Sequence, residues 1–394
     1  MLAYIFEKFP SFTQTFCARE VSAINATGIH FPVYSIRRPG NEPASAQMLY
    51  TGAVETMPEK YDTLLAENSD FRRRARKAID DMKRLWGDES EKRRIYEALW
   101  LAPRLKEQGV KHVHTHFAGI GARTAFWLNR LAGINYSLTA HANDIFRDET
   151  RERLEQIFGA AAFVVTVSDF SCRYLKQNYP KLSEKFHRVY NGIEMDKFRS
   201  TSFPQEKPLI VSVGRYIEKK GFQDLISACA ALGDRSYECL IIGHGPLEDE
   251  LRQQVASLGL VGRVIIAGPK SEAEIAELLS RAYLFVLPCV TSADGAMDNL
   301  PTVIMEAMAA GLPVVSTRLA GVPEMVLDGK TGAIVEEHDV PAVAEKMAEL
   351  LDNPELAKAQ GAAGYALCKE IFDCQVTSIS LIDLFRKYRA LPSK

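Results

Sequence analysis

The sequence predicts an α/β protein made of two doubly wound domains, and two observations lead to this fold class. Short runs of β-branched and aromatic residues alternate with longer helical stretches along the chain, which is typical of parallel sheets covered on both faces by helices. The chain has 394 residues, more than one ordinary hydrophobic core holds, so two domains are expected.

Short apolar runs mark the predicted strands in each half of the chain. In the first half they are LAYIF, FPVYSI, KHVHTHF, YSLTAH, AFVVTVS and HRVY, beginning at residues 2, 31, 111, 136, 162 and 187. In the second half they are PLIVSVG, YECLIIG, RVIIAG, YLFVLP, LPVVST and GAIV, beginning at residues 208, 237, 263, 283, 312 and 332. Sheets usually have fewer than about ten strands, so we expect two sheets; a single sheet holding all twelve runs is the alternative.

The polar, turn-rich stretch NGIEMDKFRSTSFPQEKP (191–208) marks the boundary between the halves. We therefore expect a first domain at 1–195, a second at 196–372, and a C-terminal helix at 373–394 that packs back on the first domain. That helix has apolar residues at helical spacing and needs a surface to cover. Ligands of doubly wound folds bind at the carboxyl ends of the strands, so we expect a cleft between two such edges.

Composition excludes several classes of protein. A formal net charge of −2 argues against a nucleic-acid binder that relies on bulk positive charge. No apolar run approaches the roughly 20 residues that a membrane-spanning helix needs, and the first residues lack the pattern of a secretory leader. The seven cysteines are scattered without CxxC pairs, which fits reduced thiols. A cytoplasmic protein is expected.

Basic residues and glycines follow the first strands of the second half. VSVGRYIEKKGF places Gly214, Arg215, Lys219 and Lys220 just beyond a strand, where such cations can neutralise a phosphate. The next strand ends in a glycine turn at Gly243. A solvated charged loop is the alternative interpretation.

The stretch DNLPTVIMEAMAAGLPVVST (298–317) predicts a helix over 301–310 whose N-terminus forms an anion site. Pro301 suits the first turn, with Asp298 or Asn299 as the cap. Glu306 lies in an apolar sequence one turn beyond Thr302, and its two oxygens suit a vicinal diol such as a ribose. The alternative is a glutamate that reaches solvent.

Together these motifs resemble the donor site of retaining glycosyltransferases of family 4. Two first-half segments, LTAHANDIF (138–146) and FPSFTQTF (9–16), are similar to a subgroup that builds bacterial exopolysaccharides and lipopolysaccharides. The resemblance covers nearly the whole chain. It implies the GT-B fold, two Rossmann-like domains facing across a cleft, with the nucleotide sugar held mainly by the second.

Carried over residue by residue, the resemblance implies a role for each matching position. Arg215 and Lys220 contact the donor diphosphate and stabilise the leaving group, Glu306 holds the ribose, and His141 meets a sugar hydroxyl near the reacting carbon. Donor contacts come from the segments that hold Gly214, Gly243, Asn299, Leu300, Pro301 and Thr302. The chain departs from the family pattern at Asp298, where the usual residue is glutamate, and in lacking a glycine pair in EKFPSF (7–12).

The implied reaction moves a hexose-type sugar from a nucleotide diphosphate sugar to a saccharide or lipid-linked acceptor in cell-surface polysaccharide synthesis. Two cations and a helix N-terminus stabilise the departing phosphate, so neither a divalent metal nor a cofactor is expected. Retention of configuration uses either Asp298 as a covalent nucleophile or front-face attack, in which the departing phosphate takes the acceptor's proton. A nucleotide-sugar 2-epimerase and a non-catalytic binding subunit are the competing functions.

Three further segments of the first half have two interpretations each. His112, His114 and His116 share one face of a strand; no acidic or cysteine partner is recognisable nearby, so a zinc site is not expected, and His116 either lines the acceptor side or packs. Ser11 and Thr13 either contact acceptor hydroxyls or, for Ser11 with Gln14, form a capping box. The helix predicted at 71–86 either lies on an anionic membrane or packs on its own domain with a solvated basic face.

Overall fold

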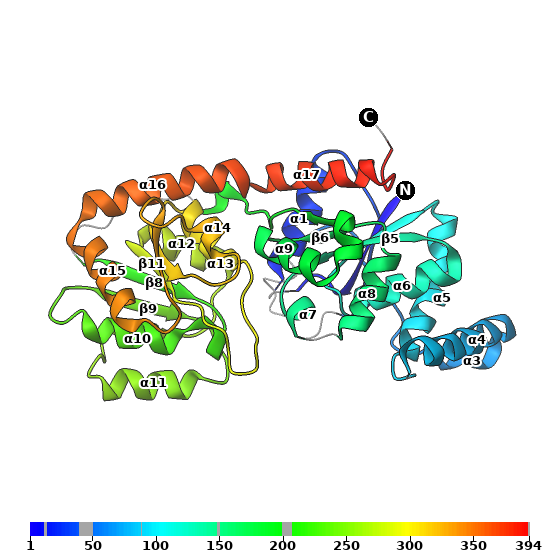
Figure 1. Cartoon of the computed structure of the whole chain (residues 1–394), viewed down its shortest axis with the longest axis horizontal. Helices are drawn as coiled ribbons and strands as arrows, with labels where there is room; N and C mark the ends of the chain where they lie inside the picture. The colour runs from blue at the N-terminus through cyan, green and yellow to red at the C-terminus, as the bar shows by residue number, and fades with distance from the viewer. Residues whose placement is uncertain (12–13, 39–49, 88, 148–149, 199–206, 393–394) are drawn as a thin grey trace. The chain divides into compact units, whose positions relative to one another are not determined.

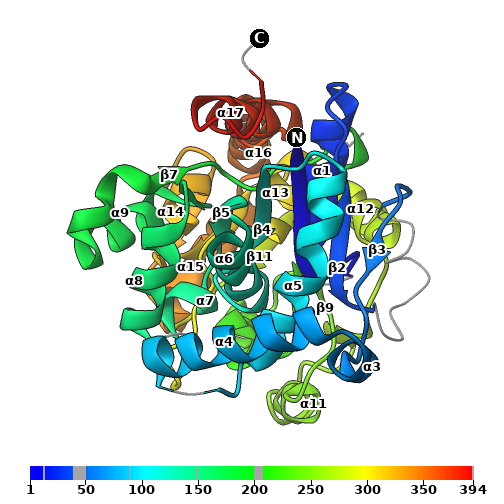
Figure 2. The same ribbon diagram turned by 90° about the vertical axis from the view of Figure 1, so that its right-hand side faces the viewer.

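The computed structural model of the chain describes residues 1–11, 14–38, 50–87, 89–147, 150–198 and 207–392. The chain divides into two compact units. Unit 1 comprises Met1–Val167, Cys172–Val189 and Ser378–Lys394, and unit 2 comprises Ser168–Ser171 and Tyr190–Thr377. Figures 1 and 2 show a twisted sheet with helices on both faces in each unit.

Unit 1 contains a seven-stranded parallel sheet of order β3-β2-β1-β4-β5-β6-β7. Its strands, in that order, are Glu55–Thr56, Val33–Arg37, Leu2–Lys8, His112–His116, Asn135–Ala140, Val164–Thr166 and Phe186–Arg188. Its helices are α1 (Thr15–Ala26), α3 (Asp62–Glu67), α4 (Ser69–Trp86), α5 (Lys92–Glu107), α6 (Ile120–Ala132), α7 (Asn143–Phe146), α8 (Arg151–Ala160) and, from its second turn on, α9 (Asp169–Asn178). The 3₁₀ helix η1 spans Pro180–Lys185.

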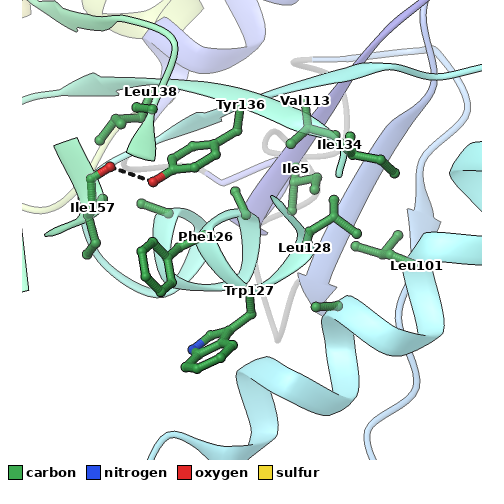
Figure 3. Packing of buried hydrophobic residues seen from close by; sticks show 14 of the residues in the cluster. Ile5, Leu101, Val113, Phe126, Trp127, Leu128, Ile134, Tyr136, Leu138 and Ile157 are labelled. Atoms are coloured by element: carbon green, nitrogen blue, oxygen red, sulfur yellow. Dashed lines mark hydrogen bonds between the residues drawn. The ribbon is translucent and has the colours of Figure 1, made fainter. Parts of the chain in front are cut away.

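The two faces of this sheet bury separate hydrophobic clusters. One face packs against α5, α6 and α8, where Tyr136 and Trp127 are among the largest buried side chains and the hydroxyl of Tyr136 donates to the carbonyl of Ile157 (Figure 3). The other face packs against α1 and the last helix, α17 (Cys374–Lys387), through Leu381, Ile382 and Phe385. The C-terminal residues therefore complete the core of unit 1.

Unit 2 contains a six-stranded parallel sheet of order β10-β9-β8-β11-β12-β13. Its strands, in that order, are Val264–Ala267, Glu238–Ile242, Leu209–Val213, Leu284–Leu287, Val314–Thr317 and Gly332–Val335. Its helices are α10 (Phe222–Ala231), α11 (Glu248–Ser257), α12 (Glu272–Arg281), α13 (Thr302–Ala309), α14 (Val322–Met325), α15 (Val340–Asp352) and α16 (Pro354–Ile371), with 3₁₀ helices η2 (Met195–Phe198) and η3 (Glu218–Lys220). In Figure 1, α10 and α11 lie on one side of this sheet and α12 and α13 on the other.

The predicted fold class, α/β with two Rossmann-like doubly wound domains, is confirmed, and each of the apolar runs overlaps an observed strand. A single sheet holding all of them is excluded by the pairing within each unit. The sequence reading missed β3, because a two-residue strand with one exposed residue has no periodicity to detect.

The predicted cap of α13 and the capping-box alternative for Ser11 are wrong. Helix α1 begins at Thr15 with Gln14 at its N-cap and no side-chain cap, so Ser11 does not form a capping box. Helix α13 begins at Thr302 with Pro301 at its N-cap and no side-chain cap, so neither Asp298 nor Asn299 caps it. The side chains of Asp298 and Asn299 instead form ion pairs and hydrogen bonds with other residues of unit 2.

Candidate functional site

Two lysines and one aspartate meet beside the carboxyl end of β8 in unit 2. The ammonium of Lys219 lies 2.9 Å from Oδ1 of Asp298, and the ammonium of Lys220 donates to Oδ2 of the same carboxylate. These side chains retain only 13–15% of their exposure. We call Lys219, Lys220 and Asp298 the lysine–aspartate cluster.

The charges of this cluster hold Asp298 and Lys220 ionised. Burial raises the pKa of Asp298, but Lys220 and Lys219 outweigh burial and lower that pKa to about 2. Burial lowers the pKa of Lys220, and Asp298 reverses that effect so that the pKa is raised overall. Because two ammonium groups share one carboxylate, the cluster keeps a net positive charge.

Glycines let three loops approach closely around the cluster. A Cβ at Gly221, whose φ is +64°, would lie 1.8 Å from the carbonyl oxygen of Pro288. A Cβ at Gly243 would lie 1.8 Å from the carbonyl oxygen of Gly214, and one at Gly214 would touch the stem of Lys220 at 3.2 Å. Gly214 and Gly243 therefore bring the loops after β8 and β9 together.

Arg215, the other predicted cation, follows β8 but is exposed. Within the part of the chain that the structure describes, its side chain forms no hydrogen bond or ion pair. Its charge is close enough to oppose the protonation of Lys220. The structure thus provides one unpaired guanidinium beside two ammonium groups that are already paired.

The segment from Asn299 to Thr302 leads into α13. The amide of Asn299 is buried, with its oxygen 2.6 Å from Oγ of Ser168 and its nitrogen 3.2 Å from Oγ of Ser171. Leu300 and Pro301 are buried and Thr302 is partly buried. The first N–H groups of a helix lack acceptors within it, so this segment presents a backbone suited to an anion.

Glu306 is 6% exposed, on the second turn of α13 among Ile304, Met305, Ala307 and Met308. The alternative of a glutamate reaching solvent is therefore wrong. A buried carboxylate needs hydrogen-bond donors or a positive charge, and Glu306 lies one turn inside the N-terminus of α13, where the helix dipole supplies positive potential. Glu306 thus combines burial with the chemistry expected of a diol ligand.

The predicted first-half residues His116 and His141 come together in unit 1. His116 ends β4, His141 directly follows β5, and Nδ1 of His116 lies 3.0 Å from Nε2 of His141. Both rings are buried. Ser11 is buried on the loop that follows β1, and Thr13 lies outside the described residues.

The expectation that the strand histidines have no acidic or cysteine partner is wrong. Glu20 of α1 places Oε1 3.0 Å from Nε2 of His116, and the hydroxyl of Tyr4 donates to the same oxygen over 2.7 Å. Cys17, one turn earlier on α1, also contacts His116. We call Tyr4, Glu20, His116 and His141 the histidine network.

Glu20, His114 and His116 also place one possible ligand atom each within 4.8 Å of one another. The ring nitrogens of His114 lie 2.8 Å from Oγ of Ser137 and 3.0 Å from Oγ1 of Thr139. Both ring nitrogens of His114 therefore have hydrogen-bond partners. Burial lowers the pKa of His114 well below its usual value.

Sequence reasoning also missed Asp144, which positions His141. Its carboxylate accepts the backbone N–H groups of Ala118 at 2.9 Å, Ala142 at 2.8 Å and His141 at 3.1 Å. The sequence HAND (141–144) contains a signal for the role of Asp144, since an aspartate at the start of a short helix commonly accepts hydrogen bonds from nearby N–H groups. No sequence signal links Glu20 to His116, because the two residues come from distant elements.

Helix α4 uses its apolar stripe within unit 1. Phe71, Ala75, Ala78 and Met82 are buried in the hydrophobic cluster that also contains residues of α5. The outward face is basic, and Ser69, Arg72, Arg73 and Arg76 line a surface hollow there. The apolar stripe is therefore not available to insert into a membrane. Only the basic outward face of α4 is available for contact with one.

Across the described residues, no helix combines the length and apolarity needed to cross a membrane.

Comparison with known proteins identifies the family of the chain. Residues 194–367 match the family model "Glycosyl transferases group 1", and residues 61–197 match the model "Glycosyltransferase Family 4".

Similar proteins include putative colanic acid biosynthesis glycosyltransferases WcaL. The protein of Escherichia coli K12 is 35% identical over 58% of this chain and 57% of its own length, and that of Salmonella typhimurium LT2 is 28% identical over 88% and 90%. The amylovoran biosynthesis glycosyltransferase AmsK of Erwinia amylovora is 34% identical over 59% of this chain and 58% of its own length. The match thus spans little more than half of the first and third relatives.

Solved structures of transferases share the fold. A glycosyltransferase from Rickettsia africae matches with a TM-score of 0.76, 16% identity and 98% coverage of both chains. Anabaena HepE in complex with UDP and glucose matches with a TM-score of 0.71, 14% identity, and coverage of 98% of this chain and 100% of that one. With two family models that together extend over residues 61–367 and these relatives, the chain belongs to the family-4 glycosyltransferases.

Proposed function

We propose that the chain is a retaining glycosyltransferase that moves a hexose-type sugar from a nucleoside diphosphate sugar to a saccharide or lipid-linked acceptor in cell-surface polysaccharide synthesis. The observation that carries this proposal is the lysine–aspartate cluster beside α13, with buried Glu306 one turn inside the helix. Its net positive charge, together with Arg215, suits a diphosphate.

The proposed step breaks the bond between the anomeric carbon and the diphosphate oxygen. Arg215 and Lys220, with the N-terminus of α13, stabilise the charge that develops on the departing phosphate. Glu306 accepts both hydroxyls of the ribose, and His141 meets a hydroxyl of the sugar. The acceptor hydroxyl attacks from the same face, and its proton passes to the departing phosphate.

Asp298 serves as a counter-ion and orienting group in this scheme. Two ammonium groups hold its carboxylate ionised and occupied, which lowers its power as a nucleophile. Front-face attack is therefore the mechanism we favour over a covalent intermediate on Asp298.

The named relatives and neighbours support the choice of substrate class. HepE structures contain UDP with glucose and UDP-glucose, and the similar proteins WcaL and AmsK are named as a putative colanic acid and an amylovoran biosynthesis glycosyltransferase. A nucleotide sugar is therefore proposed as co-substrate, with no separate cofactor.

The test is a thermal-shift screen of UDP, GDP, ADP and TDP, followed by NMR of the matching nucleotide sugar with and without acceptor. Transfer to an acceptor with the anomeric configuration of the donor supports the proposal. Conversion of the donor without acceptor indicates the 2-epimerase instead, and binding without turnover indicates a non-catalytic subunit. An inverted anomer contradicts retention.

We also propose that transfer needs no divalent metal, because the cations of the protein already balance the diphosphate. Activity should persist in excess EDTA; loss in EDTA with recovery on adding Mg²⁺ would contradict this.

We further propose that the chain acts in the cytoplasm and contacts an anionic membrane through the basic face of α4. Arg72, Arg73 and Arg76 lie on that face, and lipid-linked acceptors would be available at such a surface.

Flotation with phosphatidylglycerol-rich liposomes tests this contact. The triple variant Arg72→Gln, Arg73→Gln, Arg76→Gln should lose binding, whereas the charge-matched variant Arg235→Gln, Arg252→Gln, Arg281→Gln in unit 2 should keep it. Equal flotation of the two variants would contradict the proposed contact.

A further inference from the structure

Lys219 and Lys220 are adjacent in the chain, and they pair with different oxygens of one carboxylate. The ammonium of Lys219 lies 2.9 Å from Oδ1 of Asp298, and the ammonium of Lys220 donates to Oδ2. One lysine would be enough to balance this carboxylate. The way in which each lysine is held indicates which of the two can leave Asp298.

Lys219 is attached to both ends of the loop from Val290 to Asp298, which lies between β11 and α13. Its backbone carbonyl accepts a hydrogen bond from the N–H of Val290 over 3.1 Å. Its ammonium binds the carboxylate of Asp298 at the other end of the loop. Lys219 is therefore fixed to this loop by its backbone as well as by its side chain.

The neighbours of Lys219 in and after the η3 turn attach the turn to the same segment. The carboxylate of Glu218 accepts a hydrogen bond from the N–H of Ala293 over 3.2 Å. The backbone at Gly221 approaches Pro288 so closely that a Cβ there would lie 1.8 Å from the carbonyl oxygen of the proline. The position of Lys219 relative to Asp298 therefore depends on several contacts and not on the ion pair alone.

The side chain of Lys220 points to a different neighbour. Its stem lies against Gly214, where a Cβ would be 3.2 Å from Cδ and Cε of the lysine. Within the described part of the chain, Asp298 is the one hydrogen-bond acceptor of its ammonium. Arg215 directly follows Gly214, and its charge is close enough to act on Lys220. Lys220 is therefore the lysine that lies beside the unpaired guanidinium.

An anion that binds beside Arg215 competes with Asp298 for the ammonium of Lys220. An ammonium carries three N–H donors on a flexible stem, so it can turn from one acceptor to another. Without Lys219, this movement would leave a carboxylate of 13% exposure with no cation, which is unfavourable. With Lys219 present, Oδ1 of Asp298 stays paired when Oδ2 is released.

We propose that Lys219 is a positioning residue that holds Asp298 and thereby releases Lys220 for a phosphate anion. It lowers the cost of breaking the ion pair between Lys220 and Asp298, and it does not itself contact the phosphate. The relation between the three residues follows from the geometry of unit 2 alone. Only the identification of the anion as the diphosphate of a sugar donor rests on the proposed function.

A crystal structure of the wild-type full chain with inorganic pyrophosphate shows directly which lysine moves. Nζ of Lys219 should stay within hydrogen-bond distance of Oδ1 of Asp298, and Nζ of Lys220 should lie on a phosphate oxygen. A pyrophosphate that contacts Lys219, or one that binds while both lysines remain on Asp298, overturns the proposal. A wild-type chain that does not bind pyrophosphate also overturns it.

Isothermal titration calorimetry with inorganic pyrophosphate tests whether Lys219 acts through Asp298. Lys219→Met should weaken binding by about tenfold, because Lys220 is then the one partner left for Asp298 and is harder to release. In an Asp298→Asn background no carboxylate competes for Lys220, so adding Lys219→Met should change the dissociation constant by at most about twofold. A similar loss in both backgrounds indicates direct contact between Lys219 and the phosphate, and it overturns the proposal.

Two further variants are the controls for these titrations. Lys219→Arg keeps a cation on Asp298 and should bind pyrophosphate within about twofold of the wild type. Lys207→Met removes the same charge from an exposed lysine of unit 2, which pairs with Glu238 at 3.3 Å, and should also stay within about twofold. If Lys207→Met or Lys219→Arg weakens binding as much as Lys219→Met, net charge or side-chain size accounts for the effect, and the proposal is overturned.

Sugar transfer separates the role of Lys219 from the proposed function, because neither the crystal structure nor the titrations require transfer. If pyrophosphate binds as expected but the wild-type chain transfers no sugar from any donor, the proposed function fails and the role of Lys219 stands. If the chain transfers sugar while Lys219 contacts the phosphate, the proposed function stands and the positioning role fails.

Discussion

The lysine–aspartate cluster of unit 2 and the histidine network of unit 1 both join ionisable groups that have little exposure, but they arrange these groups differently. In the cluster, two flexible ammonium groups share one carboxylate at 13–15% exposure. In the network, rigid rings and a carboxylate are joined in a line, and the side chain of His116 is 1% exposed.

This difference teaches what each arrangement can do. An ammonium has three donors and rotates freely, so Lys220 can turn from Asp298 toward an incoming diphosphate. An imidazole in a packed line has one fixed direction for each nitrogen. The cluster is therefore suited to binding a mobile anion, and the network to fixing the position of a proton.

The largest expected effect comes from removing the cations. The double variant Arg215→Ala, Lys220→Ala should lower kcat by about 10²- to 10³-fold, because it removes charge stabilisation of the leaving group. Steady-state transfer assays measure this, with the double variant Lys207→Ala, Arg235→Ala as the control at the amino ends of β8 and β9. If the Arg215→Ala, Lys220→Ala variant keeps wild-type activity, these cations do not stabilise the leaving group. The proposed difference in function between the lysine–aspartate cluster and the histidine network would then be wrong.

Glu306→Gln should weaken nucleoside diphosphate binding by about 10- to 100-fold, the loss of a charge-assisted hydrogen bond to the ribose. Inorganic pyrophosphate, which has no ribose, should bind both proteins equally in isothermal titration calorimetry. Equal losses for the two ligands would mean that Glu306 acts through the lysine–aspartate cluster and does not contact the sugar of the nucleotide.

Asp298→Asn should lower the free energy of unfolding by about 2 kcal/mol at neutral pH, since the pKa of Asp298 falls from an ordinary value of 3.8 to about 2 in the folded chain. A lowered folded-state pKa stabilises the fold above the unfolded-state value, and this stabilisation is lost as pH falls toward about 2. Urea titrations between pH 6 and 2.5 should therefore show the wild-type and variant curves converging. A constant offset would show that packing, and not charge, accounts for the difference.

The effect that is smallest at neutral pH comes from a neighbour of the histidine network, because it develops only as pH falls below about 6.5. Burial, and next the N-terminal charge, lower the pKa of His112 to about 3. His112 therefore binds a proton in the unfolded chain but not in the folded chain, and the free energy of unfolding falls as pH drops below about 6.5. His112→Gln should reduce this fall by up to about 1.4 kcal/mol per pH unit in urea titrations between pH 6.5 and 4; parallel curves would contradict the assignment.

The sequence predicted much of unit 2's charged edge. Arg215, Lys220 and Gly214 follow a strongly apolar strand, and the carboxyl ends of parallel strands share one edge of a sheet, so their placement followed from local pattern. The cap of α13 could not be predicted, because Asp298 and Asn299 are drawn to partners elsewhere in the fold. The partner of His116 was missed for the same reason.

The sequence by itself determined every strand except β3, the two-unit organisation and the cations at the sheet edge, because these depend on residues close together in the chain, and the alternation of strands and helices indicated the parallel pairing. Only the tertiary structure decided which charges meet. Lys220 and Asp298 are 78 residues apart, and Glu20 and His116 are 96 residues apart. Such pairs depend on how whole elements pack, and the hydrophobic pattern that directs packing contains no information on which polar side chain will lie opposite another.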